Sequence, residues 1–119
     1  MDVFAFGITT VPKSIKKFME NFHIDHDCVD FFIFHQANKA MNEKIREKLK
    51  IEPEKVPHSL HEFGNTSSAS IPLTIVTQIA EQIKNKETRF VACGFGVGLS
   101  WCTVFFKTNN PVISKLVEL

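Results

Sequence analysis

Three stretches of the chain carry groups that could do chemistry, and the first is "FIFHQAN" at residues 32–38. In it a run of apolar, strand-like residues ends on His35, Gln36 and Asn38. Ligands in open α/β sheets bind beyond the carboxyl ends of strands, so polar side chains at this point suggest a site. A histidine there is nevertheless more often a hydrogen-bonded structural residue than a catalytic one. Taken alone, the stretch is suggestive only.

The second stretch is "GNTSSAS" at residues 64–70. Gly64 permits a backbone turn that other residues avoid, and Asn65 can offer its amide from that turn. Thr66 or Ser67 can cap the helix that follows, and the small residues after them let this helix approach another backbone closely. A capped, tightly packed helix without any chemistry explains the same pattern equally well.

The third stretch is the glycine-rich "GFGVG", Gly94 to Gly98. It lacks the Lys-Ser/Thr ending of a phosphate-binding P-loop, and it does not fit GxGxxG followed by a helix. Nucleotide binding is therefore not expected. A hairpin whose backbone N–H groups face a cavity suits the pattern better.

Metal and thiol chemistry find little support in the sequence. His58 and His61 lie three residues apart, but no second close pair completes the roughly four ligands that zinc needs. Cys28, Cys93 and Cys102 form no CxxC pair and occupy no evident nucleophile elbow. We expect no metal, no disulfide and no catalytic thiol among them, which fits a reducing compartment.

The hydrophobic period predicts the elements that must position these stretches. Helical spacing predicts helices near residues 12–21, 37–50 and 67–85, while the apolar lead at residues 3–11 has no clear assignment. The uninterrupted apolar run at residues 31–34 is typical of a strand buried on both faces, which requires helices on each side. A short strand near residues 56–60 and two strands around the glycine turn complete a single α/β domain. Residues 109–119 are expected to form a C-terminal tail.

Composition sets the broad class. The 119 residues are 44% hydrophobic and include 12 phenylalanines, enough to fill the core of one domain. A net charge of +1 gives no global attraction to nucleic acid, and no apolar run approaches the ~20 residues that span a membrane. No basic, apolar leader is visible either, so the chain is expected to be soluble and cytoplasmic.

Taken in this order, "HQAN", "HEFGNTSSASIP" and "GFGVGLSW" resemble the C-terminal half of β-ketoacyl-acyl carrier protein synthase III, a family of thiolase-fold condensing enzymes. The resemblance runs from Val3 to Lys107. It implies that residues 1–119 form the C-terminal half of a thiolase-like fold, with a mixed sheet and covering helices. It also implies a catalytic Cys, His and Asn set, in which His35 and Asn65 are the second and third members. The cysteine of that set belongs to an N-terminal half that these residues do not include.

The chemistry implied by the resemblance is decarboxylative Claisen condensation, in which malonyl-carrier protein becomes an enolate that attacks an acyl thioester. Neutral donors from His35 and Asn65 suit an enolate oxygen, because they are in place beforehand and bring no competing charge. The backbone N–H of Val97, where relatives often carry Gly, would help to hold the thioester carbonyl, provided that φ is negative there. No cofactor is implied beyond the substrates acyl-CoA and malonyl-carrier protein.

The predicted helix at residues 37–50 points to a partner. The resemblance implies docking of acidic acyl carrier protein on basic residues of this helix, with Lys39, Lys44 and Arg46 as candidates. Ala40 stands where relatives carry an arginine, and Asn38 is expected only to orient the site. An ordinary solvated helix face explains the same charges as well, because isolated surface charges contribute little.

Two further hypotheses stay open at this point. One is a related thiolase-fold acyltransferase that serves a secondary metabolite or a surface polysaccharide. The other is a noncatalytic module that binds acyl carrier protein, in which the motifs persist only as structure. The resemblance also implies a homodimer in the complete enzyme.

Overall fold

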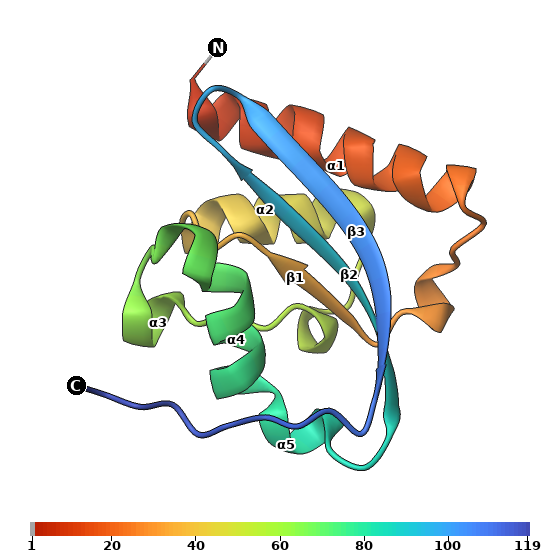
Figure 1. The fold of residues 1–119 in the computed structure, drawn as a ribbon. Helices are drawn as coiled ribbons and strands as arrows, with labels where there is room; N and C mark the ends of the chain where they lie inside the picture. Colours follow the sequence, from red (N-terminus) through yellow and green to blue (C-terminus); the bar gives the residue numbers. More distant parts are fainter. Residues whose placement is uncertain (1) are drawn as a thin grey trace.

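The computed structural model of the chain describes residues 2–119, and its three-stranded sheet is the frame for everything else. The strands are β1 (Phe31–Phe34), β2 (Glu87–Gly96) and β3 (Ser100–Asn109). The helices are α1 (Val3–Asn21), α2 (Lys39–Leu49), α3 (Leu60–Phe63), α4 (Ser70–Gln78) and α5 (Ala80–Ile83). Short 3-10 turns occupy His26–Cys28, Pro53–Lys55 and Ser67–Ala69. Figure 1 shows the arrangement.

The sheet is mixed, with the strand order β1, β2, β3. Strand β1 pairs in parallel with β2, and β2 pairs with β3 in an antiparallel hairpin. The register sets Phe34 opposite Cys93, so the carboxyl end of β1 lies beside the last residues of β2. Parallel pairing therefore brings the residues after β1 and the glycine turn after β2 to one edge of the sheet.

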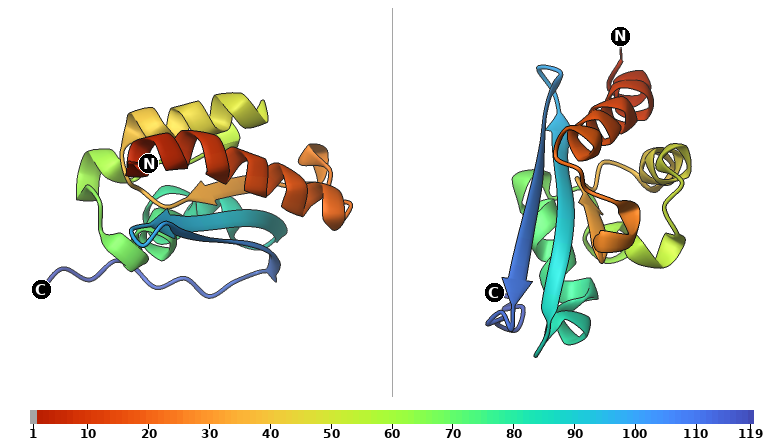
Figure 2. Two further views of the ribbon diagram at one scale, coloured as in Figure 1. Left: turned by 90° about the horizontal axis from the view of Figure 1, so that it is seen from above. Right: turned by 90° about the vertical axis from the view of Figure 1, so that its right-hand side faces the viewer.

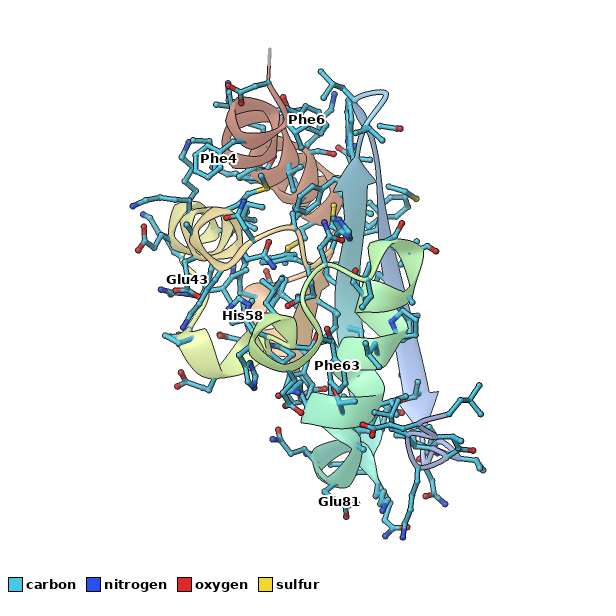
Figure 3. The ribbon with its side chains drawn as sticks, turned by 90° about the vertical axis from the view of Figure 1, so that its left-hand side faces the viewer. Phe4, Phe6, Glu43, His58, Phe63 and Glu81 are labelled. Atoms are coloured by element: carbon cyan, nitrogen blue, oxygen red, sulfur yellow. The ribbon has the colours of Figure 1, made fainter. Side chains whose placement is uncertain are left out.

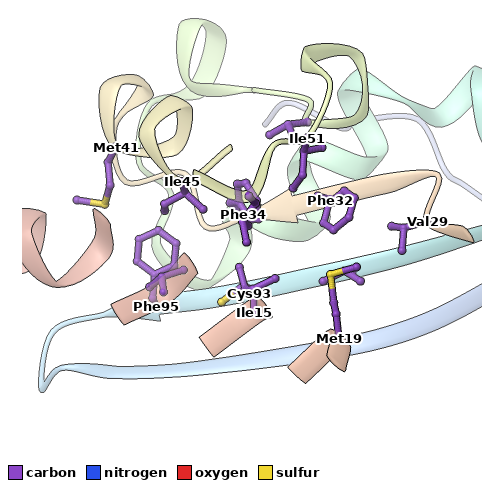
Figure 4. Packing of buried hydrophobic residues seen from close by; sticks show 14 of the residues in the cluster. Ile15, Met19, Val29, Phe32, Phe34, Met41, Ile45, Ile51, Cys93 and Phe95 are labelled. Atoms are coloured by element: carbon purple, nitrogen blue, oxygen red, sulfur yellow. The ribbon is translucent and has the colours of Figure 1, made fainter. Parts of the chain in front are cut away.

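Helices cover both faces of the sheet, and all four residues of β1 are buried. Phe32 and Phe34 belong to a cluster with side chains of α1 and α2, among them Ile15 and Ile45 (Figure 4). Phe31 and Ile33 point to the other face of the sheet and belong to a second cluster, against α4 and α5. Figure 2 shows the two helical layers on either side of the strands. The expectation of a mixed sheet covered on both faces is confirmed.

Helix α1 begins at Val3, nine residues earlier than the sequence pattern indicated, and Pro12 lies inside it. Proline has no N–H, so the carbonyl four residues before it, that of Ile8, has no normal helical donor. Lys48 of α2 fills this gap, because its Nζ donates to the Ile8 carbonyl at 2.6 Å. The Asp2 carboxylate caps the helix start by accepting from the Ala5 N–H at 2.7 Å. Long-range support of this kind cannot be read from the sequence.

Helices α1 and α2 touch closely at Gly7. A Cβ built on Gly7 would lie 2.5 Å from Sδ of Met41, a side chain that is itself buried. We expect Gly7→Ala to destabilise the chain by about 1–3 kcal/mol, the usual scale for overpacking a core, despite the better helix propensity of alanine. Urea unfolding followed by circular dichroism would measure the loss. Because Met41→Ala alone leaves a cavity, the comparison is the cost of Gly7→Ala in a Met41→Ala background, which should nearly vanish. An undiminished cost in that background would show that the clash is not the cause.

Two sequence expectations about the middle of the chain are wrong. No strand forms near residues 56–60, because the backbone there is held by other partners: the Val56 N–H donates to Pro53 and the Ser59 N–H to the Gln36 side chain. The single helix expected for residues 67–85 is two helices, α4 and α5, which are separated by a break at Ile79 with φ −129°. The break points Ile79 into the core, where it is buried.

Asn109, where the tail was expected to begin, is the last residue of β3, and residues 110–119 have no regular structure. Ile113 packs on the cluster under α5, while Val112 and Val117 are exposed. None of the helices within residues 2–119 is both long and apolar enough to cross a membrane.

Candidate functional site

One pocket brings together the three stretches that the sequence singled out. Its volume is about 900 Å³, and its wall includes His35 from the end of β1, Asn65 from the loop before α4, and Val97 from the turn after β2. Ser70 and Cys102 also line it. These residues are far apart in sequence, and the parallel pairing of β1 with β2 gathers them at one edge of the sheet.

His35 is held on three sides. Its backbone N–H continues the β ladder by donating to the Cys93 carbonyl at 2.9 Å. Its Nδ1 lies 2.9 Å from Oγ of Ser70, and its ring meets Phe95 edge to face, with 5.4 Å between centroids. Burial lowers the pKa of His35, and a hydrogen bond with the Ser67 backbone acts in the opposite direction. A lowered pKa keeps the imidazole neutral near pH 7, which suits a hydrogen-bond donor without charge.

Asn65 sits in a tightly specified turn. Its Oδ1 accepts from the Ser67 N–H at 3.0 Å, so this contact does not use the two Nδ2 hydrogens of the amide. Gly64 before it has φ 65° and ψ −152°, a backbone region that essentially only glycine occupies. Ser67 after it has φ 55°, the left-handed conformation. The expectation that Gly64 makes a turn closed to other residues is confirmed.

The glycine turn joins β2 to β3 as a hairpin, as predicted. Gly98 and Leu99 take positive φ values of 85° and 35°, whereas Val97 is not among the residues of positive φ. A valine is therefore sterically acceptable at this position, in line with the expected negative φ. Val97 is 83% exposed and lines the pocket.

Cysteine chemistry finds no support from Cys93. Burial raises the pKa of its thiol to about 11, against a smaller opposite effect of the Thr103 hydroxyl. A thiol with so high a pKa is almost entirely protonated at neutral pH and is a poor nucleophile. Cys28 and Cys102 are exposed, and Cys102 reaches the pocket wall. Residues 2–119 contain no group of three or more His, Cys, Asp or Glu side chains placed to hold a metal ion.

Gln36 and Asn38 have structural partners. The Gln36 side chain is completely buried, donates to the Phe34 carbonyl at 2.8 Å and accepts from the Ser59 N–H at 3.0 Å. Asn38 is the N-cap of α2, where its Oδ1 accepts from the Met41 N–H at 2.8 Å. Both residues therefore fix the elements that carry His35, and neither lines the pocket.

Sequence reasoning missed Ser70, which is 1% exposed and contacts the His35 ring. A signal was available in its spacing from Thr74, because residues four apart share one face of a helix. The serine was instead interpreted only as a small residue that allows close packing.

The basic side chains of α2 differ in how free they are. Lys39 is exposed, and Lys44 is exposed but its Nζ lies 3.0 Å from the Glu47 carboxylate.

Arg46 is half-buried, with 2.9 Å between its Nη2 and the Glu43 carboxylate and a further hydrogen bond to the Ile51 carbonyl. His58 also reaches Glu43, at 3.0 Å (Figure 3). The Arg46 hydrogen bond is the main cause that lowers the pKa of Glu43. Arg46 is thus held inward, and Lys39 is the freest of the three candidates.

Comparison with known proteins gives a consistent answer. The family described as 3-Oxoacyl-[acyl-carrier-protein (ACP)] synthase III C terminal matches residues 19–108. The β-ketoacyl-[acyl-carrier-protein] synthase III of Trichodesmium erythraeum is 39% identical over 108 residues, which are 91% of this chain and 33% of that protein. The corresponding synthase of Staphylococcus haemolyticus is also 39% identical, over 89% of this chain and 34% of its own length.

Solved structures agree in fold. The 3-oxoacyl-(acyl-carrier protein) synthase of Burkholderia xenovorans LB400 superposes with a TM-score of 0.90 at 36% identity, over 97% of this chain and 34% of the other. The 3-oxoacyl-(acyl carrier protein) synthase III of Pseudomonas aeruginosa PAO1 gives 0.84 at 27% identity, over 92% and 35%. The chain spans about a third of the length of each of these relatives. With its motifs, its mixed sheet and its family match in agreement, the chain belongs to the family of 3-oxoacyl-[acyl-carrier-protein] synthase III C-terminal domains.

Proposed function

We propose that residues 1–119 are the C-terminal catalytic part of an acyltransferase that performs decarboxylative Claisen condensation in fatty acid biosynthesis, and that residues 109–119 are an appended tail. The observation that carries this proposal is that His35 and Asn65, two side chains that can donate hydrogen bonds without charge, line the same pocket. The names of the relatives support the reaction class, because they are 3-oxoacyl-[acyl-carrier-protein] synthases.

In the proposed reaction the bond between the α-carbon and the carboxylate of malonyl-carrier protein breaks, and carbon dioxide leaves. The electron pair moves toward the thioester carbonyl, so negative charge develops on an enolate oxygen. His35 and Asn65 donate to that oxygen, each worth ~3 kcal/mol if it behaves as a typical preorganised donor. The enolate carbon then attacks the acyl thioester carbonyl, a carbon–carbon bond forms, and a thiolate leaves. The Val97 N–H is the proposed donor to that second carbonyl.

The nucleophile that carries the acyl group is proposed to come from outside this chain. Cys93 is buried and its raised pKa argues against it, and Cys28 lies outside the pocket wall. Cys102 is exposed and lines the pocket, so it is the cysteine that the labelling experiment below must exclude. We assign the acyl-carrying cysteine to an N-terminal part, as the length of the relatives supports. The complete enzyme is then a cytoplasmic homodimer that takes acyl-CoA and malonyl-carrier protein and uses no cofactor.

Acyl carrier protein is the proposed macromolecular partner. Lys39 and Lys44 are exposed, Lys39 as the first residue of α2, shortly after the strand end that carries His35, and Lys44 in the middle of the helix. Cationic side chains there would attract an acidic partner and raise its rate of encounter. Arg46 remains part of the proposed surface, but it would have to exchange Glu43 for the partner in order to take part.

The isolated chain is expected to be inactive. Residues 1–119 incubated with radiolabelled acyl-CoA should show no stable acyl label and no carbon dioxide release from malonyl-carrier protein, because one of the three catalytic groups is missing. Mass spectrometry of tryptic peptides would locate any label. Acylation of Cys28, Cys93 or Cys102 at the turnover rate of a synthase would contradict the assignment of the nucleophile to another segment.

The positive counterpart is a chimera. In it, this chain replaces the matching third of the Burkholderia xenovorans synthase, which has the higher TM-score of the two solved structures described above. The chimera should self-acylate and release carbon dioxide. A folded chimera that self-acylates but never decarboxylates would refute the proposed role of this chain. The coding sequence upstream of Met1 offers an independent check, because it should encode a cysteine at a strand-to-helix turn.

A further inference from the structure

Ser70 occupies a place between the pocket and the buried interior. Its side chain is 1% exposed, at the first residue of α4. Its Oγ has two partners, Nδ1 of His35 at 2.9 Å and the backbone N–H of Gln36 at 3.2 Å. One hydroxyl therefore contacts two consecutive residues at the end of β1, and one of them is the histidine of the pocket.

The hydroxyl proton of Ser70 has a defined destination. The Gln36 N–H can only donate, so it occupies a lone pair of Oγ and cannot receive the proton. Within residues 2–119 the structure gives Oγ no hydrogen-bond partner other than these two. A buried hydroxyl proton without an acceptor is unfavourable, so the proton points at Nδ1 of His35. Nδ1 then carries a lone pair, and the ring proton resides on Nε2.

A closed ring of buried hydrogen bonds keeps Ser70 in position. The Thr74 hydroxyl donates to the Ser70 carbonyl at 2.7 Å, so the Ser59 hydroxyl, 2.7 Å from Thr74, must be the donor of that second contact. The Ser59 N–H in turn donates to the Gln36 side chain at 3.0 Å. Gln36 closes the ring through its own N–H to Ser70. The ring joins the end of β1, the loop before α3 and helix α4.

We propose that Ser70 is a positioning residue that selects the tautomer of His35, so that Nε2–H and not Nδ1–H is the donor offered to the pocket. A competing arrangement exists, in which Nδ1 keeps its proton and donates to Oγ of Ser70. It leaves the Ser70 hydroxyl proton without an acceptor. The catalytic meaning of the tautomer rests on the proposed function, because it determines which nitrogen can donate to the enolate oxygen. The choice of tautomer itself is independent of the proposed function.

The test uses the 119-residue chain labelled with ¹⁵N at histidine. Long-range ¹H–¹⁵N correlation spectra distinguish the two neutral tautomers by the chemical shifts of the ring nitrogens, and the spectrum of His35→Gln identifies the His35 signals. We expect the wild-type chain to hold the Nε2–H form in excess by about tenfold, the upper range of one net buried hydrogen bond. In Ser70→Ala the Nδ1–H form should become measurably populated, and both nitrogen shifts should move toward averaged values.

Two matched variants complete the test. Ser70→Thr keeps the hydroxyl and should keep the wild-type signature. Thr77→Ala removes a hydroxyl from the same helix whose hydrogen-bond partners all lie within α4: it donates to the Leu73 carbonyl at 2.7 Å and accepts from the Gln78 side chain. This variant should leave the His35 spectrum unchanged. If Ser70→Ala does not fold, Ser70→Cys replaces it, because a thiol of similar size is a much weaker donor.

A wild-type spectrum dominated by Nδ1–H would overturn the proposal, as would a folded Ser70→Ala chain with unchanged His35 shifts. Neither spectrum requires a substrate or a second protein segment. The proposal about Ser70 can therefore fail while His35 still serves decarboxylation, and the proposed function can fail while Ser70 still selects the tautomer.

Discussion

Replacing either donor of the pocket should slow malonyl decarboxylation by about 10²–10³-fold in the complete synthase, the usual scale for losing one preorganised donor. In the proposed reaction, His35→Ala and Asn65→Ala each remove one hydrogen bond that strengthens as charge develops on the enolate oxygen. Acylation of the nucleophile by acyl-CoA should fall much less, because it precedes the formation of the enolate. The double variant should lose less than the product of the two effects, since both donors address one atom and act as a unit.

Two measurements separate these steps: burst acylation with labelled acyl-CoA, and carbon dioxide release from malonyl-carrier protein. Circular dichroism checks that each variant folds, which is a real question for His35 because it contacts Ser70 and Phe95. Normal decarboxylation by both folded variants would show that the donor assignment is wrong. An equal collapse of acylation in both would mean that the residues activate or position the cysteine instead.

The parts of the fold that follow from local pattern were predictable from the sequence. The uninterrupted run Phe31–Phe34 indicated burial on both faces, and the structure places helices on each side. The glycine turn between β2 and β3 was predictable because few residues take the positive φ that Gly98 has.

What the pattern could not supply depends on contacts between distant segments. Helix α1 continues through Pro12 because Lys48, which is 36 positions away along the printed sequence, donates to the carbonyl that the proline leaves free. The expected strand near residues 56–60 fails for the same kind of reason. Its Ser59 N–H is taken by the buried Gln36 side chain, so it cannot join a ladder.

The pocket shows the same division. His35 and Asn65 were predicted as site residues from their motifs, and both line one pocket in the structure. The residue behind them, Ser70, was missed because small serines before a helix are common and only the fold shows which one meets an imidazole. Arg46 was identified by charge alone, and its pairing with Glu43 emerges only when α2 is folded. Single residue types indicate the chemistry, whereas the groups that orient them come from tertiary structure.

Gly64→Ala should be the most damaging change in the Asn65 loop. At φ 65° and ψ −152° an alanine is strained by about 1–3 kcal/mol, even though a Cβ at this position would meet nothing within 4 Å. The loss is therefore conformational and not steric. The loop can relieve it by changing the turn, which would move the Asn65 amide away from the pocket. We expect a lower melting temperature and, in the complete synthase, a fall in decarboxylation approaching the ~10²-fold effect of losing the Asn65 donor.

Gly96→Ala is the matched control for stability, because a Cβ there also meets nothing within 4 Å and the backbone φ is ordinary. Its unfolding free energy should change by no more than about 0.5 kcal/mol, the range typical of harmless substitutions, and its melting temperature should therefore change little. Thermal unfolding of both variants, alongside carbon dioxide release for Gly64→Ala, makes the comparison. Equal stability of the two variants would show that the turn relaxes without cost. If Gly64→Ala then also decarboxylates normally, the unusual backbone at this glycine is not what holds Asn65 in the pocket.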